Sequence, residues 1–168
     1  MGEAYLYVPE HMQADDFCTF YAPCKGDRNP PCTVCNYAAG VSFGRGAIRF
    51  QRGAWNKITM TVILNTPNVT NGVIEVKYND TVAIRYDKIN WRQKDGVWIE
   101  GVEAATWFGG SDQTWAPPND TYTLFRNFRA WRSDGPTVYN APLNTNKRSV
   151  ELPPAHDKPI VEEFELIG

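Results

Sequence analysis

Residues 55–65, Trp55-Asn-Lys-Ile-Thr-Met-Thr-Val-Ile-Leu-Asn65, carry the clearest secondary-structure signal of the chain. Apolar side chains at positions 58, 60, 62 and 64 alternate with polar ones at 57, 59 and 61. Alternation with a period of two is typical of a β-strand that buries one face and turns the other to solvent. Turn-forming residues follow at Thr66-Pro67-Asn68 and Asn71-Gly72, so the sequence predicts a strand that ends in a turn.

Short strands of this kind, bounded by Gly, Pro, Asn and Asp, recur on both sides of this stretch. The further strands that we predict span 3–9, 41–53, 73–78, 82–86, 88–93, 97–102, 104–108 and 121–131. Hairpin turns are expected at Asn79-Asp80 and at Lys94-Asp95-Gly96. No segment shows sustained helical periodicity, so the expected fold class is all-β, an antiparallel β-sandwich of jelly-roll type.

Composition divides the chain into two parts. Residues 1–132 hold the predicted strands and form the expected jelly-roll domain, which includes a long Pro- and Cys-containing loop at 10–40. Residues 133–168 form a Pro-rich C-terminal extension, in which 160–167 is expected to be an edge strand or a tail. A chain of 168 residues is long enough to bury a sizeable core in one domain.

Charge argues against two classes of partner. The formal net charge is −2, from 17 basic and 19 acidic residues, which does not favour nucleic acid or an anionic membrane. No run approaches the 18 apolar residues of a membrane-spanning helix. Aromatic residues make up 13% of the chain and include six Trp, which fits an all-β protein with stacking surfaces.

The four cysteines, Cys18, Cys24, Cys32 and Cys35, all lie in the 10–40 loop. We favour disulfides over a zinc site because the spacing of the first two fits a zinc ribbon poorly, and the pairing stays open. Three acceptor sequons, at Asn68, Asn79 and Asn119, also suggest glycosylation in an oxidising, extracellular setting. The chain opens without a signal peptide, so we interpret it as a fragment that lacks its N-terminal part.

The first predicted strand, 3–9, carries two tyrosines on one face. Leu6 and Val8 point to the opposite side from Tyr5 and Tyr7 because side chains alternate along a strand. The two phenols are then roughly 7 Å apart. Such a pair can stack on a sugar ring or move a proton, although two amphipathic tyrosines at a sheet surface are the simpler interpretation.

In the strand at 41–53, Arg45 is flanked by Gly44 and Gly46. Alternation places Arg45 and Arg49 on one face, and the glycines allow a ligand or another backbone to come close. A bulge with solvated arginines is an equally good interpretation. Glu75, Glu100 and Glu103 also lie on predicted strands, but nothing in the sequence pairs them.

Several reaction classes fit this chain poorly. Its two histidines, His11 and His156, fall in loop or tail composition, and neither a nucleophile elbow nor a phosphate-binding loop is present. Tyr, Trp, Arg and Lys suit a uronate polymer instead: aromatic rings stack on sugars and cations pair with carboxylates. β-Elimination, with tyrosine as base or acid, is the chemistry that this set favours.

Four stretches occur in order over roughly residues 2–132. They are Gly2-Glu-Ala-Tyr-Leu-Tyr-Val-Pro9; Gly44-Arg-Gly-Ala-Ile-Arg-Phe50 with Gly53-Ala-Trp55; Leu64-Asn65 with Asn71-Gly72; and Thr106-Trp-Phe-Gly-Gly-Ser-Asp112 with Trp115-Ala116. In these stretches the chain resembles polysaccharide lyase family 14, the alginate and glucuronan lyases with a β-jelly roll, and most of all its secreted fungal members.

The resemblance implies a function and a site. Tyr5 and Tyr7 match the active-site Tyr-x-Tyr strand of the family. Arg45 and Arg49, because of their shared strand face, and Trp115 are the expected substrate contacts. The implied partner is an acidic polysaccharide such as alginate or glucuronan, the implied location is extracellular, and we expect no cofactor and no metal. Endo or exo action and the oligomeric state stay open.

The resemblance also implies a difference from the family. A Ser-x-Arg strand and a Gly-Gly-Lys segment precede the Tyr-x-Tyr strand in the family and have no counterpart here. We therefore expect a sandwich that is incomplete at its N-terminus and a chain that retains little or no catalysis. Two other hypotheses are a non-catalytic carbohydrate-binding sandwich and an unrelated structural or zinc-linked β domain.

Overall fold

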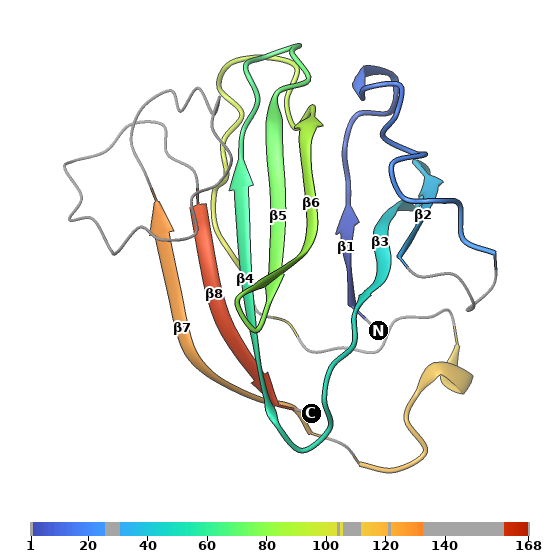
Figure 1. Ribbon diagram of the computed structural model, residues 1–168, viewed down its shortest axis with the longest axis vertical. Coiled ribbons are helices and arrows are strands. Elements are labelled where there is room, and N and C mark those ends of the chain that lie inside the picture. Colours follow the sequence, from blue (N-terminus) through green and yellow to red (C-terminus); the bar gives the residue numbers. More distant parts are fainter. Residues whose placement is uncertain are drawn as a thin grey trace.

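The computed structural model describes residues 2–25, 31–103, 105, 112–120, 122–132 and 160–167. Within them the chain forms two antiparallel β-sheets, visible in Figure 1 as two groups of strands. The only helical elements of this part are single 3-10 turns, among them η1 (Glu10–Met12) and η3 (Gln113–Trp115). The expected all-β, antiparallel sandwich is therefore confirmed. No helix in the described residues is long and apolar enough to span a membrane.

The smaller sheet has the strand order β1-β3-β2. Its strands are β1 (Gly2–Leu6), β2 (Cys32–Asn36) and β3 (Gly40–Ile48). The register places Tyr5 of β1 opposite Ser42 of β3. The sequence predicted only loop where β2 lies. The segment becomes a strand because the outer edge of β3 offers it backbone hydrogen-bond partners, which local composition does not reveal.

The larger sheet has the order β6-β5-β4-β8-β7. Its strands are β4 (Trp55–Ile63), β5 (Gly72–Tyr78), β6 (Thr81–Ile89), β7 (Leu124–Arg132) and β8 (Ile160–Ile167). The expectation of an edge strand or tail at 160–167 was wrong, because β8 pairs with β4 on one side and β7 on the other. The domain boundary at residue 132 stays a prediction.

The hairpin expected from 88–93 and 97–102 does not form. β6 continues to Ile89, and the described residues after it, up to 103, contain no strand. The side chain of Asn65 explains this difference: its Oδ1 accepts from the backbone N–H groups of Trp91 and Arg92, and its Nδ2 donates to the Arg92 carbonyl. These bonds replace the strand ladder. The strand expected at 104–108 lies outside the described residues, except for position 105.

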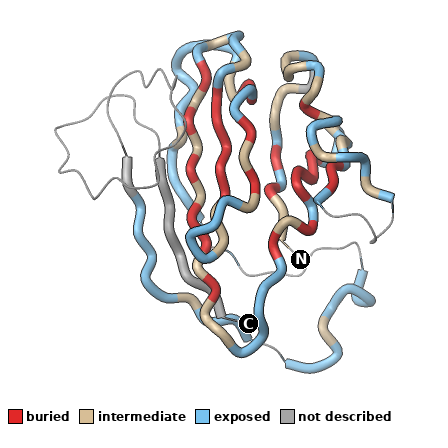
Figure 2. The backbone as a smooth tube through the Cα atoms, in the orientation of Figure 1, coloured by how far each residue is buried: buried red, intermediate tan, exposed pale blue. Residues whose placement is uncertain are grey.

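A hydrophobic core fills the space between the two sheets, where Figure 2 shows the buried backbone concentrated. The smaller sheet contributes Ala4, Leu6, Val41, Phe43 and Ile48, and the larger one Ile58, Ile74, Val76, Ile84, Tyr86 and Ile89. Phe17 enters from the loop after η1 and stacks on Phe43, with ring centroids 5.2 Å apart. Gly44 is explained here too, since a Cβ on it would lie 3.0 Å from Ile84 of the facing sheet.

Two disulfides hold the segment between β1 and β3. Cys18 is bonded to Cys35 and Cys24 to Cys32. No cysteine is left free, so the zinc-linked hypothesis is wrong and the expected disulfides are confirmed. Because Cys32 and Cys35 lie on β2, both cross-links join the preceding loop directly to the smaller sheet.

Candidate active site

The outer face of β1, which points away from the core, carries the two tyrosines. The side chains of Ala4 and Leu6 are buried, while Tyr5 is 48% exposed and Tyr7, just beyond the end of the strand, is 80% exposed. The two rings meet edge to face with their centroids 5.5 Å apart. The alternation in the sequence therefore gave the correct face for both phenols.

Tyr5 is fixed by the turn between β2 and β3. Its hydroxyl donates a hydrogen bond of 2.8 Å to the backbone carbonyl of Ala39. Its ring lies over Gly40, where an added Cβ would be 2.4 Å from a ring carbon. Within the described residues the Tyr7 hydroxyl has no such partner.

A small polar network lies on the same face of the smaller sheet. Ser42 of β3 donates a hydrogen bond of 2.5 Å to the Glu3 carboxylate, and the Arg45 Nε lies 3.8 Å from the same carboxylate oxygen. Arg45 is half exposed, so its guanidinium stays within reach of an anion from solvent. Glu3 thereby links Arg45 to the strand that carries the tyrosines.

The two other expected substrate contacts lie apart from this network. Arg49 follows the end of β3, is exposed, and forms no ion pair within the described residues. Trp115 ends η3, the yellow-orange coil at the lower right of Figure 1, and is 61% exposed. Among the described contacts, none joins Trp115 or Arg49 to the tyrosines, so their roles stay predictions.

A shallow hollow adjoins the tyrosines at the end of β1. Its lining consists of Leu6, Tyr7, Val8, Tyr37 and Gly40. Tyr37 is half-buried, and its hydroxyl lies 3.2 Å from the Cys18 Sγ of the disulfide. This hollow offers aromatic and aliphatic surface beside two phenols, which is the composition that packs against the apolar face of a sugar ring.

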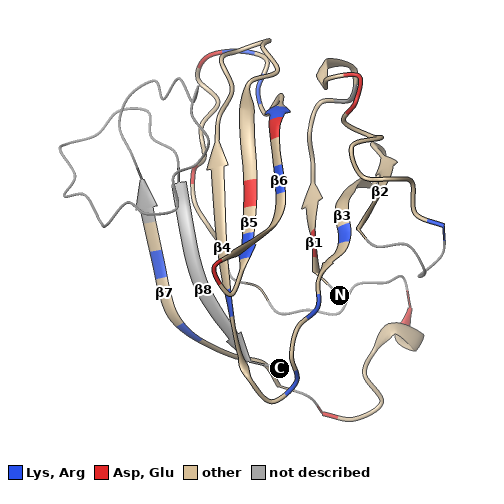
Figure 3. Cartoon of the chain, in the orientation of Figure 1, with Lys and Arg blue, Asp and Glu red and all other residues tan. Residues whose placement is uncertain are grey.

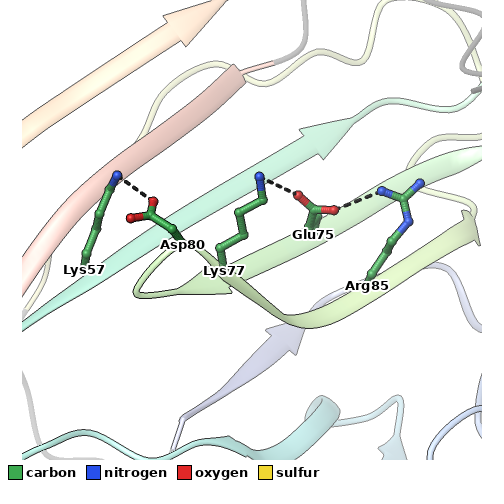
Figure 4. A network of polar contacts seen from close by, with 5 residues as sticks. All are labelled: Lys57, Glu75, Lys77, Asp80 and Arg85. Carbon is green, nitrogen blue, oxygen red and sulfur yellow. Dashed lines mark hydrogen bonds and ion pairs between the residues drawn. The ribbon is translucent and has the colours of Figure 1, made fainter. Parts of the chain in front are cut away.

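A second charged cluster lies on the larger sheet, where Figure 3 shows basic and acidic positions on β5 and β6 and Figure 4 shows their side chains. Glu75 of β5 is only 3% exposed, and its carboxylate lies 2.9 Å from Arg85 and 3.5 Å from Lys77. Lys57 pairs with Asp80 farther along the same face. Glu75 is thus neutralised by structural partners. The other two carboxylates considered from the sequence, Glu100 and Glu103, lie outside any strand.

The predicted glycosylation sites all lie at the surface of the protein. The sequon asparagines Asn68, Asn79 and Asn119 are all exposed, so each is accessible to a glycosyl transferase, and glycosylation stays a prediction. Within the described residues no group of three or more His, Cys, Asp or Glu side chains is placed to hold a metal ion.

The sequence interpretation missed four contributors to this surface. Glu3 was identifiable, because it alternates with Tyr5 and Tyr7 on the same strand face. Ser42, Gly40 and the carbonyl of Ala39 were not, because their proximity to β1 depends on the pairing of strands that are more than 30 residues apart. Local pattern carries no information about that pairing.

Fold and surface together define an antiparallel β-sandwich whose smaller sheet presents a tyrosine pair, an arginine and a carboxylate to solvent, a surface suited to sugars. The family profile described as Polysaccharide lyase 14 matches residues 1–128. The chain belongs to polysaccharide lyase family 14, so the expected family is confirmed, with a lyase-type function and a polysaccharide substrate. No curated protein and no solved structure matches the chain.

Proposed function

We propose that this domain cleaves a uronate-containing polysaccharide, alginate or glucuronan, by β-elimination at the outer face of β1. The observation that carries this proposal is the exposed pair of Tyr5 and Tyr7, with their rings in contact, on the outer sheet face of a chain from a lyase family. A phenol is a competent general acid or base when it can reach the proton being transferred.

The reaction needs three groups around one uronate ring. A base takes the proton from C5, the electron pair left behind forms the C4–C5 double bond, and the glycosidic oxygen leaves C4 and takes up a proton from an acid. A cation stabilises the negative charge that develops on the C6 carboxylate. Tyr5 and Tyr7 are assigned to acid–base work, and Arg45 is assigned to the carboxylate, with Arg49 and Trp115 as further contacts.

Arg45 suits this role because Glu3 orients its guanidinium without forming a tight ion pair with it. Its distance of 3.8 Å from Glu3 is long for a charge-assisted hydrogen bond, and half of its side chain is exposed. An incoming carboxylate can therefore approach the guanidinium without breaking a tight internal ion pair. Because this guanidinium can receive a carboxylate, we propose that the polysaccharide substrate is acidic.

An extracellular location fits the covalent features of the chain. Both disulfides form within the segment between β1 and β3, and disulfides persist in oxidising compartments. The three exposed sequon asparagines agree with passage through a secretory route. We propose that the protein acts outside the cell on a polymer that does not enter it.

The test is direct. The chain is incubated separately with alginate, glucuronan and a neutral glucan, and the ultraviolet absorbance of the unsaturated product is followed. We expect absorbance to rise with at least one uronate polymer and to stay flat with the neutral glucan. Tyr7→Phe should lower the rate about 10²–10⁴-fold, the usual contribution of a general acid or base.

Tyr122→Phe is the matched control, because Tyr122 is also highly exposed and, among the described contacts, none joins it to Tyr5, Tyr7 or Arg45. Its rate should equal that of the unmodified chain. Retained binding of the uronate polymers without any unsaturated product would instead support the alternative, a non-catalytic carbohydrate-binding sandwich, and would refute the lyase proposal.

A further inference from the structure

We propose that Gly40 and the backbone carbonyl of Ala39 are positioning elements of the site, which clamp Tyr5 so that it orients Tyr7. This narrows the acid–base role assigned above to the tyrosine pair: Tyr7 takes the C5 proton and returns a proton to the leaving oxygen, and Tyr5 positions it. This inference rests on the proposed function for its catalytic part. Its geometric part, the clamp itself, stands on contacts within the chain and is testable without turnover.

The first half of the clamp is the ring contact at Gly40. Gly40 has a φ of +121°, a conformation that side-chain-bearing residues rarely adopt. A Cβ there would lie 2.4 Å, 2.8 Å and 3.0 Å from Cε1, Cζ and the hydroxyl oxygen of Tyr5. The ring therefore occupies the space that the Cβ of any other residue would fill, and glycine at this position lets Tyr5 approach the β2–β3 turn.

The second half is the hydrogen bond at Ala39. The Tyr5 hydroxyl donates to the Ala39 carbonyl at 2.8 Å, across a sequence separation of 34 residues. While that bond persists, the hydroxyl proton is directed at the carbonyl and not at a leaving oxygen. Tyr7, whose hydroxyl has no partner within the described residues, is the phenol that remains available to a substrate.

The acceptor is itself held in place. The backbone N–H of Ala39 donates to the Asn36 carbonyl at 2.9 Å, which closes the turn. Cys35, on the strand that leads into this turn, is cross-linked to Cys18. The carbonyl is therefore part of a stapled turn, and a bond to it fixes Tyr5 relative to the smaller sheet.

The clamp orients Tyr7 through the contact between the Tyr5 and Tyr7 rings. The edge of one tyrosine ring meets the face of the other at a centroid distance of 5.5 Å. Because Tyr7 lies beyond the last residue of β1, the strand ladder does not position it. The Tyr5 ring is its described aromatic neighbour, so displacement of Tyr5 should release Tyr7 as well.

The geometric test compares two glycine substitutions. Gly40→Ala introduces a Cβ into the Tyr5 ring, whereas Gly53→Ala introduces one at a φ of +67° where no atom lies within 4 Å. Both strain the backbone, but only the first touches the clamp. In NMR spectra of protein with ¹³C-labelled tyrosine, we expect Gly40→Ala to shift the Tyr5 and Tyr7 resonances and Gly53→Ala to leave both in place. Unmoved resonances in a folded Gly40→Ala protein would overturn the clamp.

The kinetic test separates the two tyrosines. Tyr5→Phe keeps the ring over Gly40 and removes only the hydroxyl, so we expect kcat to fall about tenfold or less, with KM little changed, whereas Tyr7→Phe lowers kcat about 10²–10⁴-fold. Equal losses for both variants would overturn the division of roles. If Gly40→Ala fails to fold, the Tyr7 resonance of Tyr5→Phe, which lacks the bond to Ala39, decides the matter without turnover: an unmoved resonance would overturn the clamp.

Failure of the clamp and failure of the proposed function give different results. A chain that forms no unsaturated product, but in which Gly40→Ala moves both tyrosine resonances, refutes the lyase reaction and retains the clamp. A chain that is active, but whose tyrosine resonances and rate are unaffected by Gly40→Ala, retains the reaction and refutes the clamp.

Discussion

Asp16 joins the loop after η1 to strand β6. Its two carboxylate oxygens accept from the Tyr86 hydroxyl at 2.9 Å and from the Lys88 ammonium at 2.7 Å. The hydrogen bond from Lys88, and then that from Tyr86, lower the pKa of the Asp16 carboxyl. The pKa of Tyr86 is raised, first by burial and then by Asp16. One carboxylate thus satisfies the hydroxyl of a tyrosine that is almost fully buried in the core.

We predict that Asp16→Ala destabilises the protein at neutral pH by about 1–3 kcal/mol, because the buried Tyr86 hydroxyl loses its acceptor. The folded pKa lies below the ordinary value of 3.8, so the stabilisation is complete above that value and disappears as the pH falls through the folded pKa. Urea unfolding of both proteins at neutral and acidic pH measures this difference, which should shrink in acid. Asp15→Ala, at an exposed neighbour, is the control. A difference that does not change with pH would contradict the assignment.

At the scale of elements, β4, β5 and β6 carry charges of alternating sign on their outer face, which Figure 4 shows as one row. Glu75 is almost fully buried between Arg85 and Lys77, while the Asp80 side chain in the β5–β6 hairpin is 72% exposed. Buried and exposed ion pairs respond differently to loss of a charge, because water replaces only an exposed partner. Within this row of charges, the exposed Asp80 therefore serves as a control for the buried Glu75.

We predict that Glu75→Gln lowers the free energy of unfolding by about 1–3 kcal/mol, since it leaves two partly buried cations without a full counter-charge. Asp80→Asn should cost less than about 1 kcal/mol. Asparagine is the appropriate replacement because Asp80 has a φ of +65°, which asparagine tolerates. Chemical denaturation of both variants at low and high salt gives the comparison. Similar costs for the two variants would show that burial does not govern this row.

For the molecule as a whole, cross-links compensate for the irregular segment between β1 and β3. That segment reaches the core through Phe17 and is held by two disulfides. Cys18 and Cys35 also pack against the core, so their bond connects the loop, β2 and the sandwich interior. The turn that holds Tyr5 follows directly from β2, and this links global stability to the candidate site.

We predict that loss of the Cys18–Cys35 bond, which spans 17 residues, lowers the free energy of unfolding by about 3 kcal/mol. Loss of Cys24–Cys32, which spans 8 residues, should cost about 2.5 kcal/mol. Paired Cys→Ser variants and thermal unfolding with and without reductant measure both effects. Only the first variant should also shift the Tyr5 resonance, and an equal shift in both would contradict the link between this disulfide and the site.

The sequence by itself determined the features that depend on neighbours along the chain. Alternation placed the strand at 55–65 and put Tyr5 and Tyr7 on the outer face of β1, because side-chain direction in a strand is a local property. The spacing of the cysteines, with the sequons, favoured disulfides over a metal site, and the structure agrees. The ordered motifs pointed to the lyase family.

Only the tertiary structure decided the features that join distant segments. It made β2 a strand and placed β8 inside the larger sheet. It also bonded the backbone N–H of Trp91 to the Asn65 side chain, where the sequence predicted a hairpin from 88–93 and 97–102. It also brought Ala39 and Gly40 under Tyr5. Each of these contacts depends on strand order and register, which are set by burying one shared core between the two sheets. A short stretch of sequence does not show which distant strands will share that core, so it cannot predict strand order or register.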